Sequence, residues 1–154
     1  MRIVVGGDHA GFALKEPIVD RLRSWGHDVV DVGTHDPEPV DFPDIARELC
    51  AKLIAGEAER GVMVCGTGVG ASIAANKVPG IRATVAHDVY SAHQGVEHDD
   101  VNVLCLGAQV VGIELASDLL RAYLSARHSE APEFRRRVAK LGAMEREQTA
   151  PPRT

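Results

Sequence analysis

Short apolar runs alternate along this chain with longer segments in which apolar residues recur at helical spacing. The runs are rich in valine and isoleucine and have the length of single strands. They predict strands over residues 2–6, 29–32, 61–65, 81–86 and 101–106. The intervening segments predict a loop over 33–44 and helices over residues 11–25, 45–54, 71–75, 88–97, 113–123 and 132–147. In the first helix, Pro17 is expected near the first turn, where proline is tolerated.

Five strand–helix units in succession predict an α/β fold of Rossmann-like type, with a five-stranded parallel sheet and helices on both of its faces. The nearly unbroken apolar character of the strands agrees with this, because parallel strands are buried on both faces. Ligands of such sheets bind beyond the carboxyl ends of the strands. We therefore expect the functional site among residues 6–11, 65–71, 87–88 and 107–112.

Length and composition set the domain count and exclude some functions. The 154 residues fit one domain, which we place at residues 1–147, and a flexible tail over 148–154. The net charge of -5 lacks the basic excess of a nucleic-acid binder, and no apolar run approaches the length of a membrane span. The first residues already form a strand pattern, so we expect no signal peptide. Three cysteines without metal-type spacing fit a reduced, cytoplasmic protein.

The most informative stretch follows the third predicted strand and reads Cys65-Gly66-Thr67-Gly68-Val69-Gly70-Ala71-Ser72. Its alternating glycines let the backbone turn sharply and bring amides close to a ligand, and the loop opens a helix, whose N-terminus attracts negative charge. We expect an anion or a developing oxyanion here. Two other interpretations stay open. One is a plain strand-to-helix turn, and the other is a dinucleotide site formed by Gly66, Gly68 and Ala71 with Asp88 as the ribose-binding acid.

Cys65 lies at the end of the strand, directly before this amide-rich loop. A helix N-terminus and nearby cations favour the thiolate, which is the reactive form of cysteine. Such a thiolate can remove a proton from a carbon next to a carbonyl, and the loop amides can stabilise the resulting enediolate. The alternative is that Cys65 is a small buried apolar residue, which is our interpretation of Cys50 and Cys105.

Histidines supply further candidates for acid–base chemistry. Asp8 and His9 lie in a glycine-rich turn just past the first strand and are candidate site residues, although Asp8 can equally cap the following helix. In the stretch from His87 to Asp100, His93 and Glu97 share a helix face, so a divalent metal held by His87, His93 and His98 is one interpretation and a solvated polar helix the other. His98 ends the helix and is expected to face the site, where it can move protons on a sugar ring oxygen.

The remaining charged candidates lie elsewhere in the chain. His27, His35 and His128 are expected on the surface. The run Arg135-Arg136-Arg137 stands out in an acidic protein, and arginine binds phosphate through its planar fork. It is either a solvated helix end or, if the helix reaches a neighbouring subunit, a means of closing that subunit's site.

Several motifs together resemble one family closely. They are Gly7-Asp8-His9-Ala10-Gly11, Asp31-Val32-Gly33-Thr34, the stretch from Val64 to Arg82, and Asn102-Val103-Leu104. The chain resembles ribose-5-phosphate isomerase B and its relatives, which include the galactose-6-phosphate isomerase subunits. This resemblance covers residues 1–147 and implies a three-layer α/β/α sandwich that works as a homodimer or tetramer with shared active sites.

The resemblance also implies residue roles. Cys65 matches the family's base, Thr67 its helper beside the anion hole, and His98 the residue that opens the sugar ring. Because one branch of the family replaces the cysteine by a glutamate where this chain has Ala71, the chain fits the cysteine branch. The implied substrate-binding residues are Asp8, His9, Gly66, Gly68, Val69, Gly70, Ala71, Ser72, Asp99, Arg135 and Arg137, with His9 and Arg137 at the phosphate.

The implied function is an aldose–ketose isomerase for ribose 5-phosphate and ribulose 5-phosphate, acting through a cis-enediolate with no metal or cofactor. Many relatives have arginine where this chain has Gln109 and asparagine where it has Asp99, and they often have arginine or histidine at the positions of Glu133 and Phe134. These departures keep another substrate open: erythrulose 4-phosphate, allose or galactose 6-phosphate, or an unphosphorylated sugar. The alternative from another functional class is a non-catalytic nucleotide-binding module.

Overall fold

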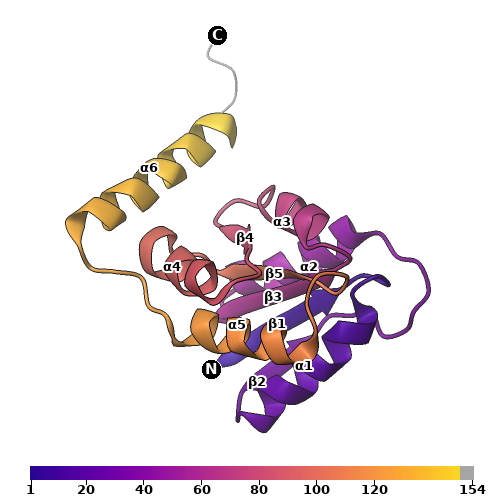
Figure 1. The fold of residues 1–154 in the computed structure, drawn as a ribbon. Helices are drawn as coiled ribbons and strands as arrows, with labels where there is room; N and C mark the ends of the chain where they lie inside the picture. The colour runs from indigo at the N-terminus through magenta and orange to yellow at the C-terminus, as the bar shows by residue number, and fades with distance from the viewer. Residues whose placement is uncertain (150–154) are drawn as a thin grey trace.

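The computed structural model describes residues 1–149 and confirms an α/β fold with one five-stranded parallel sheet (Figure 1). The strand order across the sheet is β2-β1-β3-β5-β4. The strands are β1 (Arg2–Gly7), β2 (Asp28–Asp31), β3 (Arg60–Cys65), β4 (Ala83–Val85) and β5 (Val103–Gly107). The helices are α1 (Phe12–Ser24), α2 (Phe42–Ile54), α3 (Val69–Ala75), α4 (Val89–Asp99), α5 (Ile113–Ser125) and α6 (Pro132–Thr149).

The sheet is buried on both faces, as its apolar strands predict. Successive strand residues point to opposite faces, so Val62 and Val64 pack with α1, α4 and α5, whereas Met63 and Cys65 pack with α2 and α3. The result is a three-layer α/β/α sandwich. Within residues 1–149, no helix is long and apolar enough to cross a membrane.

The elements differ from the predictions mainly near their ends, and four differences have a clear physical reason. α2 begins at Phe42, three residues early, because Pro43 occupies the first turn, where its fixed φ suits a helix. β4 begins at Ala83, since the amide of Arg82 donates to the Asn102 side chain. Pro17 lies deeper in α1 than expected, on its exposed side, where water can bond the carbonyl left without a partner.

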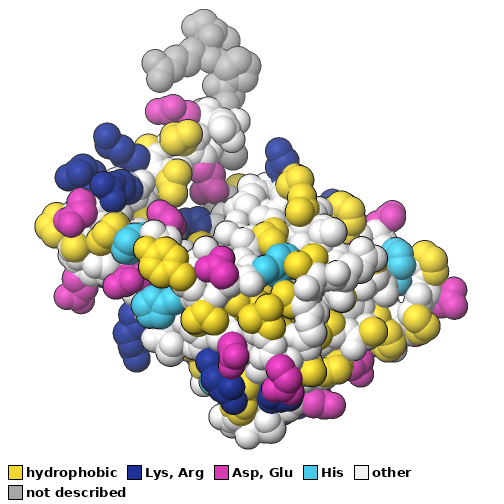
Figure 2. All heavy atoms as spheres, viewed as in Figure 1, with side chains coloured by type: hydrophobic (Ala, Val, Ile, Leu, Met, Phe, Trp, Pro, Cys, Tyr) yellow, Lys and Arg dark blue, Asp and Glu magenta, His cyan; other side chains and the backbone are white. Residues whose placement is uncertain are grey.

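The fourth difference is at the C-terminus. α6 continues to Thr149, two residues past the predicted domain end, and the rest of the predicted tail, 150–154, lies outside the described residues. Figure 1 shows α6 leaving the body of the sandwich beside α4, and Figure 2 shows basic side chains gathered over it. Towards its far end, the Glu145 carboxylate accepts from the Gly80 amide at 3.0 Å and ties the helix to the body of the fold.

One side chain protects the edge strand β4. The Asn76 amide donates to the Ala83 carbonyl at 2.8 Å and accepts from the Ala83 amide at 2.9 Å. It therefore satisfies both backbone groups of one edge residue, as a neighbouring strand would. An edge with its polar groups satisfied is a poor template for pairing with another chain.

Candidate active site

Two loops meet at the carboxyl end of β3. The Asp8 amide donates to the Val64 carbonyl at 3.2 Å, next to Cys65. A Cβ atom on Gly7 or Gly11 would lie 2.5 Å or 2.1 Å from that same carbonyl oxygen. Glycine is therefore required at both positions for the two backbones to approach so closely. This contact brings the predicted site residues Asp8 and His9 beside the Cys65 loop.

Asp8 and His9 are each oriented by a backbone amide. The Asp8 carboxylate, almost fully buried, accepts from the Gly11 amide at 3.0 Å, so part of it holds the turn before α1. His9 is exposed, and its Nδ1 accepts from the Val40 amide at 3.2 Å. Because an amide can only donate, the neutral His9 ring carries its proton on Nε2. His9 therefore offers a hydrogen-bond donor to an anionic ligand.

The Cys65 thiol is held by the loop that follows it. The Gly68 amide donates to Sγ at 3.0 Å, and Gly68 adopts φ +83°, a conformation open to glycine at little cost. The side chain is 5% exposed, at the base of the loop. An amide aimed at sulfur stabilises negative charge there. This is the environment that a thiolate base needs.

The other two cysteines lie deeper in the same core. Cys50 and Cys105 are fully buried, and all three thiols are free. Burial raises the pKa of Cys50 from its ordinary 9.0 to about 11. The pKa of Cys105 is also raised, mainly by burial and further by its neighbour Cys65. Both match the prediction of small, unreactive core residues.

The loop after Cys65 divides into an open part and a packed part. Thr67 is exposed, and its Oγ1 accepts from the Val69 amide at 3.3 Å. Gly70 is covered by the Phe42 ring, which a Cβ would approach to 2.9 Å. Ala71 is fully buried in the core. The part of the loop open to a ligand is therefore the segment 66–69, whose Thr67 and Val69 are exposed.

Ser72 does not belong to the open part of the loop. Its hydroxyl donates to the Ala83 carbonyl at 3.3 Å, and its amide donates to the Gly68 carbonyl at 3.0 Å within α3. Both of its donors are already used. The prediction that Ser72 contacts substrate is not supported by this geometry, because the helix turns the side chain toward β4.

Residues from β5 and the loop after β4 complete this edge. The backbone amide of Gln109 donates to the Gly66 carbonyl at 2.9 Å. The Gln109 side chain lies over Gly66, where a Cβ atom on Gly66 would be 3.4 Å from it. His87 accepts at Nε2 from the Gly107 amide at 3.0 Å. Gln109 stands out in the sequence only because many relatives have arginine there, and no sequence pattern identifies Phe42 or Val40 as neighbours of the site. The glycines signal a close neighbour without identifying it.

His98 lies at the opposite edge of the sheet from Cys65. α4 runs back along the sheet after β4, so it ends near the amino ends of the strands. The next residues confirm this, because the Val101 carbonyl accepts from Arg60 at the start of β3 at 2.6 Å. Cys65 ends that strand, six residues long, so the two ends are roughly 16 Å apart at about 3.3 Å per residue. Within one chain, His98 therefore does not face the Cys65 loop, and the expectation that it faces the site requires the site of another copy.

The other predicted residues of α4 and α6 lie with His98. Asp99 lines a hollow of about 380 Å³ between β4 and α6. The Arg135 Nε donates to the Ser129 carbonyl at 2.9 Å, and the Arg137 guanidinium carbon lies 5.5 Å from the centre of the Phe134 ring. The predicted site residues therefore form two groups, one around Cys65 and one around His98. Within a single chain, these two groups lie at opposite edges of the sheet.

The other histidines do not form a metal site. His93 Nδ1 lies 3.7 Å from the Glu97 carboxylate. His87 instead accepts from the Gly107 amide, and His98 contacts the Gln94 side chain. Among the residues that the structure describes, no group of three or more His, Cys, Asp or Glu could hold a metal ion. His35 is exposed, as predicted. His128 is not, since its side chain is 12% exposed and 4.0 Å from the Asp100 carboxylate.

Asp88 has a structural role at the start of α4. Its carboxylate accepts from the Ser91 amide at 2.7 Å and so caps α4, and these hydrogen bonds hold its pKa below the usual range. An N-cap aspartate is a common structural use of the residue. The dinucleotide interpretation, which needs Asp88 for a ribose, therefore loses its acidic partner.

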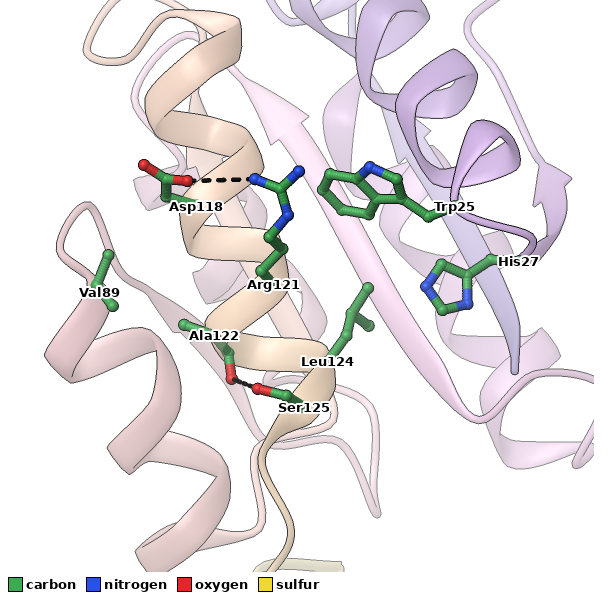
Figure 3. A pocket seen from close by; sticks show the side chains of 8 residues that line it. All are labelled: Trp25, His27, Val89, Asp118, Arg121, Ala122, Leu124 and Ser125. Carbon is green, nitrogen blue, oxygen red and sulfur yellow. Dashed lines mark hydrogen bonds and ion pairs between the residues drawn. The ribbon is translucent and has the colours of Figure 1, made fainter.

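A large hollow lies away from both groups. It measures about 680 Å³, between the end of α1 and the outer side of α5 (Figure 3). Arg121 stacks 4.5 Å above the Trp25 ring and pairs with Asp118, so its charged group is already engaged. Cavity size therefore does not locate the site of this protein.

Comparisons with known proteins agree with one another. Residues 3–141 match the family model described as Ribose/Galactose Isomerase. The chain is 44% identical to ribose-5-phosphate isomerase B of Escherichia coli (strain K12), over 94% of this chain and 96% of that one. It is also 44% identical to D-erythrulose-4-phosphate isomerase 2 of Mycolicibacterium smegmatis, over 80% and 84%. The solved structure of Clostridium thermocellum ribose-5-phosphate isomerase B superposes with a TM-score of 0.93 at 44% identity, covering 96% of this chain and 99% of that one.

The chain belongs to the ribose/galactose isomerase family. It is an isomerase, and the resemblance stated from its motifs is confirmed. In this isomerase the Cys65 edge consists of residues 7–11, 65–70 and Gln109. The His98 corner consists of Gln94, His98, Phe134 and Arg137. We use these two names below.

Proposed function

We propose that this aldose–ketose isomerase interconverts ribose 5-phosphate and ribulose 5-phosphate by metal-free proton transfer, with Cys65 as the base. The observation that carries the proposal is the Cys65 thiol, with the Gly68 amide donating to its sulfur at 3.0 Å below an open, amide-rich loop. Acid–base chemistry at carbon needs a base and a stabilised oxyanion in one place. The Cys65 edge offers both.

The proposed proton transfer has two steps. The Cys65 thiolate takes the proton from C2 of the open aldose, the C2–H electron pair forms the C1–C2 double bond, and the carbonyl oxygen at C1 becomes the enediolate oxygen. The thiol then returns the proton to C1 while the proton on the C2 hydroxyl moves to the C1 oxygen, which leaves the ketone at C2. Loop amides and the Thr67 hydroxyl hold the enediolate, and His9 holds the phosphate from its Nε2–H.

A second copy of the chain completes the proposed site. Ring opening needs an acid, and phosphate binding benefits from an arginine. His98 and Arg137 are too far from Cys65 in one chain, at opposite ends of β3 and its neighbours. We infer a homodimer in which the His98 corner of one chain faces the Cys65 edge of its partner.

Turnover of ribose 5-phosphate in EDTA tests the chemistry, and mixed dimers test the shared site. Cys65→Ala and His98→Asn are each expected to lose most activity, on the order of 10²-fold or more. Refolding the two inactive variants together should restore about a quarter of wild-type activity, because half of the random dimers contain one intact site.

Each failure has its own meaning. Unchanged turnover by Cys65→Ala would overturn the base. Activity lost in EDTA and restored by manganese would overturn the metal-free mechanism. A mixture as inactive as its parents would overturn the shared site. A well-folded wild type with no turnover would overturn the substrate.

A second candidate substrate is erythrulose 4-phosphate. The observation in its favour is Gln109, an uncharged side chain lying over Gly66 where many relatives of the resembled family carry arginine. A relative 44% identical to this chain carries the name D-erythrulose-4-phosphate isomerase 2. The ratio of kcat/KM for the two substrates, in wild type and in Gln109→Arg, decides between them.

A further inference from the structure

The His98 imidazole is held on three sides. The Gln94 side-chain nitrogen lies 2.9 Å from Nδ1, one helical turn earlier on α4. The Phe134 ring, from α6, stacks on one face with the ring centres 4.0 Å apart and the planes 17° from parallel. Nε2 lies 3.9 Å from the Glu97 carboxylate, and the side chain as a whole is 30% exposed. The ring is therefore fixed at Nδ1 and on one face, and the side chain remains partly exposed.

The Gln94 contact also fixes where the proton lies on the neutral ring. An amide nitrogen donates and cannot accept, so Nδ1 must accept from it. The neutral imidazole therefore carries its proton on Nε2, the nitrogen on the side of the Glu97 carboxylate. When both nitrogens are protonated, glutamine can turn its amide and accept with its oxygen. A glutamine can therefore stay hydrogen-bonded to Nδ1 in both protonation states of the ring, which an apolar residue cannot do.

Phe134 connects His98 to the arginine of the same corner. The Arg137 guanidinium carbon lies 5.5 Å from the centre of the ring that stacks on His98. Both contacts are of the kind that aromatic rings form favourably. One side chain therefore sets the spacing between the group assigned to ring opening and the group assigned to phosphate.

We propose that Gln94 and Phe134 are positioning residues for His98: Gln94 fixes the Nε2–H tautomer, and Phe134 fixes the ring plane together with Arg137. This inference rests on the proposed function for the role of His98, but the tautomer itself does not depend on any activity. It is carried by the hydrogen bond at Nδ1 and by the stack between α4 and α6.

Nitrogen NMR of the intact protein, labelled with ¹⁵N-histidine, tests the tautomer without substrate. At a pH where His98 is neutral, we expect a protonated Nε2 and a bare Nδ1, with the signals assigned through His98→Asn. Gln94→Leu should mix the two tautomers and bring the two nitrogen shifts toward each other. Gln94→Glu should reverse them, because a carboxylate accepts only and draws the proton to Nδ1. A wild type with the proton on Nδ1, or shifts unmoved by both variants, would overturn the role of Gln94.

Kinetics test whether the positioning matters. Gln94→Leu and Phe134→Leu should each lower kcat/KM for ribose 5-phosphate about 10-fold or more, as part of the contribution of an acid–base group. Phe134→His, which keeps a stacking ring, should remain within about threefold of wild type. Gln148→Leu makes the same chemical change on the exposed end of α6 and should have no effect.

A substrate without a sugar ring separates positioning from general damage. Erythrose 4-phosphate carries its phosphate on the hydroxyl that would close a five-membered ring, so it needs no ring opening. If it is turned over, the loss in Gln94→Leu should be confined to the five-carbon sugar. If Gln94→Leu and Phe134→Leu match Gln148→Leu with ribose 5-phosphate, the positioning role is overturned. A folded wild type inactive on every sugar would instead overturn the proposed function, and the NMR result would stand alone.

Discussion

The Cys65 edge and the His98 corner carry the two halves of one proposed site, and the chain builds them in opposite ways. At the Cys65 edge, backbone meets backbone, and Gly7 and Gly11 lie so close to the Val64 carbonyl that no side chain fits. At the His98 corner, side chains from α4 and α6 meet through a ring stack and a hydrogen bond. The first region has a closely packed backbone base beneath exposed residues such as His9 and Thr67, whereas the second is formed by partly exposed side chains.

This difference explains why only one half of the proposed site, the Cys65 edge, can be recognised from an amino-acid sequence. A backbone contact that tolerates only glycine leaves a pattern of glycines, whatever the rest of the chain does. A stack of two rings can be replaced by several other pairs and leaves no fixed spacing. The difference also has a mechanical consequence. α6 leaves the body of the sandwich beside α4 (Figure 1), so in the proposed dimer we expect the His98 corner to adapt to the partner more readily than the Cys65 edge.

The largest effect is expected from filling the contact at the Cys65 edge. Gly11→Ala places a Cβ 2.1 Å from the Val64 carbonyl, so the turn carrying Asp8 and His9 must move. A shift of about 1 Å in a catalytic group costs on the order of 10²-fold in rate, so we expect at least that loss of kcat/KM. Steady-state kinetics with ribose 5-phosphate measure it.

Gly112→Ala is the matched control for this substitution. Gly11 and Gly112 both precede a helix and both have φ -92°, but a Cβ on Gly112 meets nothing within 4 Å. The control should keep wild-type activity. Gly11→Ala leaves the His98 corner untouched, so refolding it with His98→Asn should restore activity. Equal activity of the two alanine variants would contradict the rigid contact.

The next effect concerns the ion pair that supports the same edge. The fully buried Lys15 ammonium lies 2.6 Å from the Asp31 carboxylate and 3.0 Å from Glu16. Asp31 in turn accepts from the Gly33 amide, and the Gly33 carbonyl accepts from Gly7. The pair therefore anchors the strand-end turn on which Gly7 rests.

Asp31→Asn removes the main partner of a buried charge. Breaking such a pair costs about 3–5 kcal/mol, and we expect the lower end because Glu16 remains. Asp118→Asn breaks a pair whose side chains are 57% and 63% exposed and should change stability by less than about 0.5 kcal/mol. Urea unfolding measures both. Equal midpoints for the two variants would show that Lys15 finds another partner.

The fold could be predicted from the sequence almost completely. The strands are buried on both faces, so their apolar runs are continuous, and the alternation with helices fixes the parallel order. The errors lie at element ends, where single contacts decide. Pro43 extends α2 backward, and the bond from Arg82 to Asn102 delays β4.

The site could be predicted only in part. The Cys65 loop and the turn at Asp8 and His9 follow from glycine positions and from the carboxyl-edge rule. The position of His98 at the opposite edge of its own chain could not be predicted, because it precedes the last strand and nearness in sequence suggests nearness to the site. A helix returning along a sheet ends far from where it began. No pattern of residue types reports which side chain of α6 meets α4.

A smaller effect is expected at the sheet edge beside the His98 corner. Asn76→Ala removes both hydrogen bonds to the backbone of Ala83 in β4. Each such bond contributes roughly 0.5–1.5 kcal/mol, so we expect a loss of about 1–2 kcal/mol in the free energy of unfolding. Asn76→Asp keeps the acceptor and loses the donor, so its loss should be intermediate. A negligible change in both variants would show that water replaces the amide.

The last effect appears only above about pH 9 and distinguishes the buried thiols from Cys65, the proposed base. Burial raises the pKa of Cys50 from 9.0 to about 11, so the folded protein keeps this proton where the unfolded chain has lost it. Its contribution to stability is complete below about pH 9 and is lost as the pH rises to about 11. Urea midpoints from pH 8 to 11 should therefore fall, and Cys50→Ala should make that fall shallower. The slope should not vanish, because burial also raises the pKa of Cys105 and of Tyr123. An unchanged slope in Cys50→Ala would mean that the Cys50 thiolate is tolerated in the core, and the contrast with Cys65 would then rest on position alone.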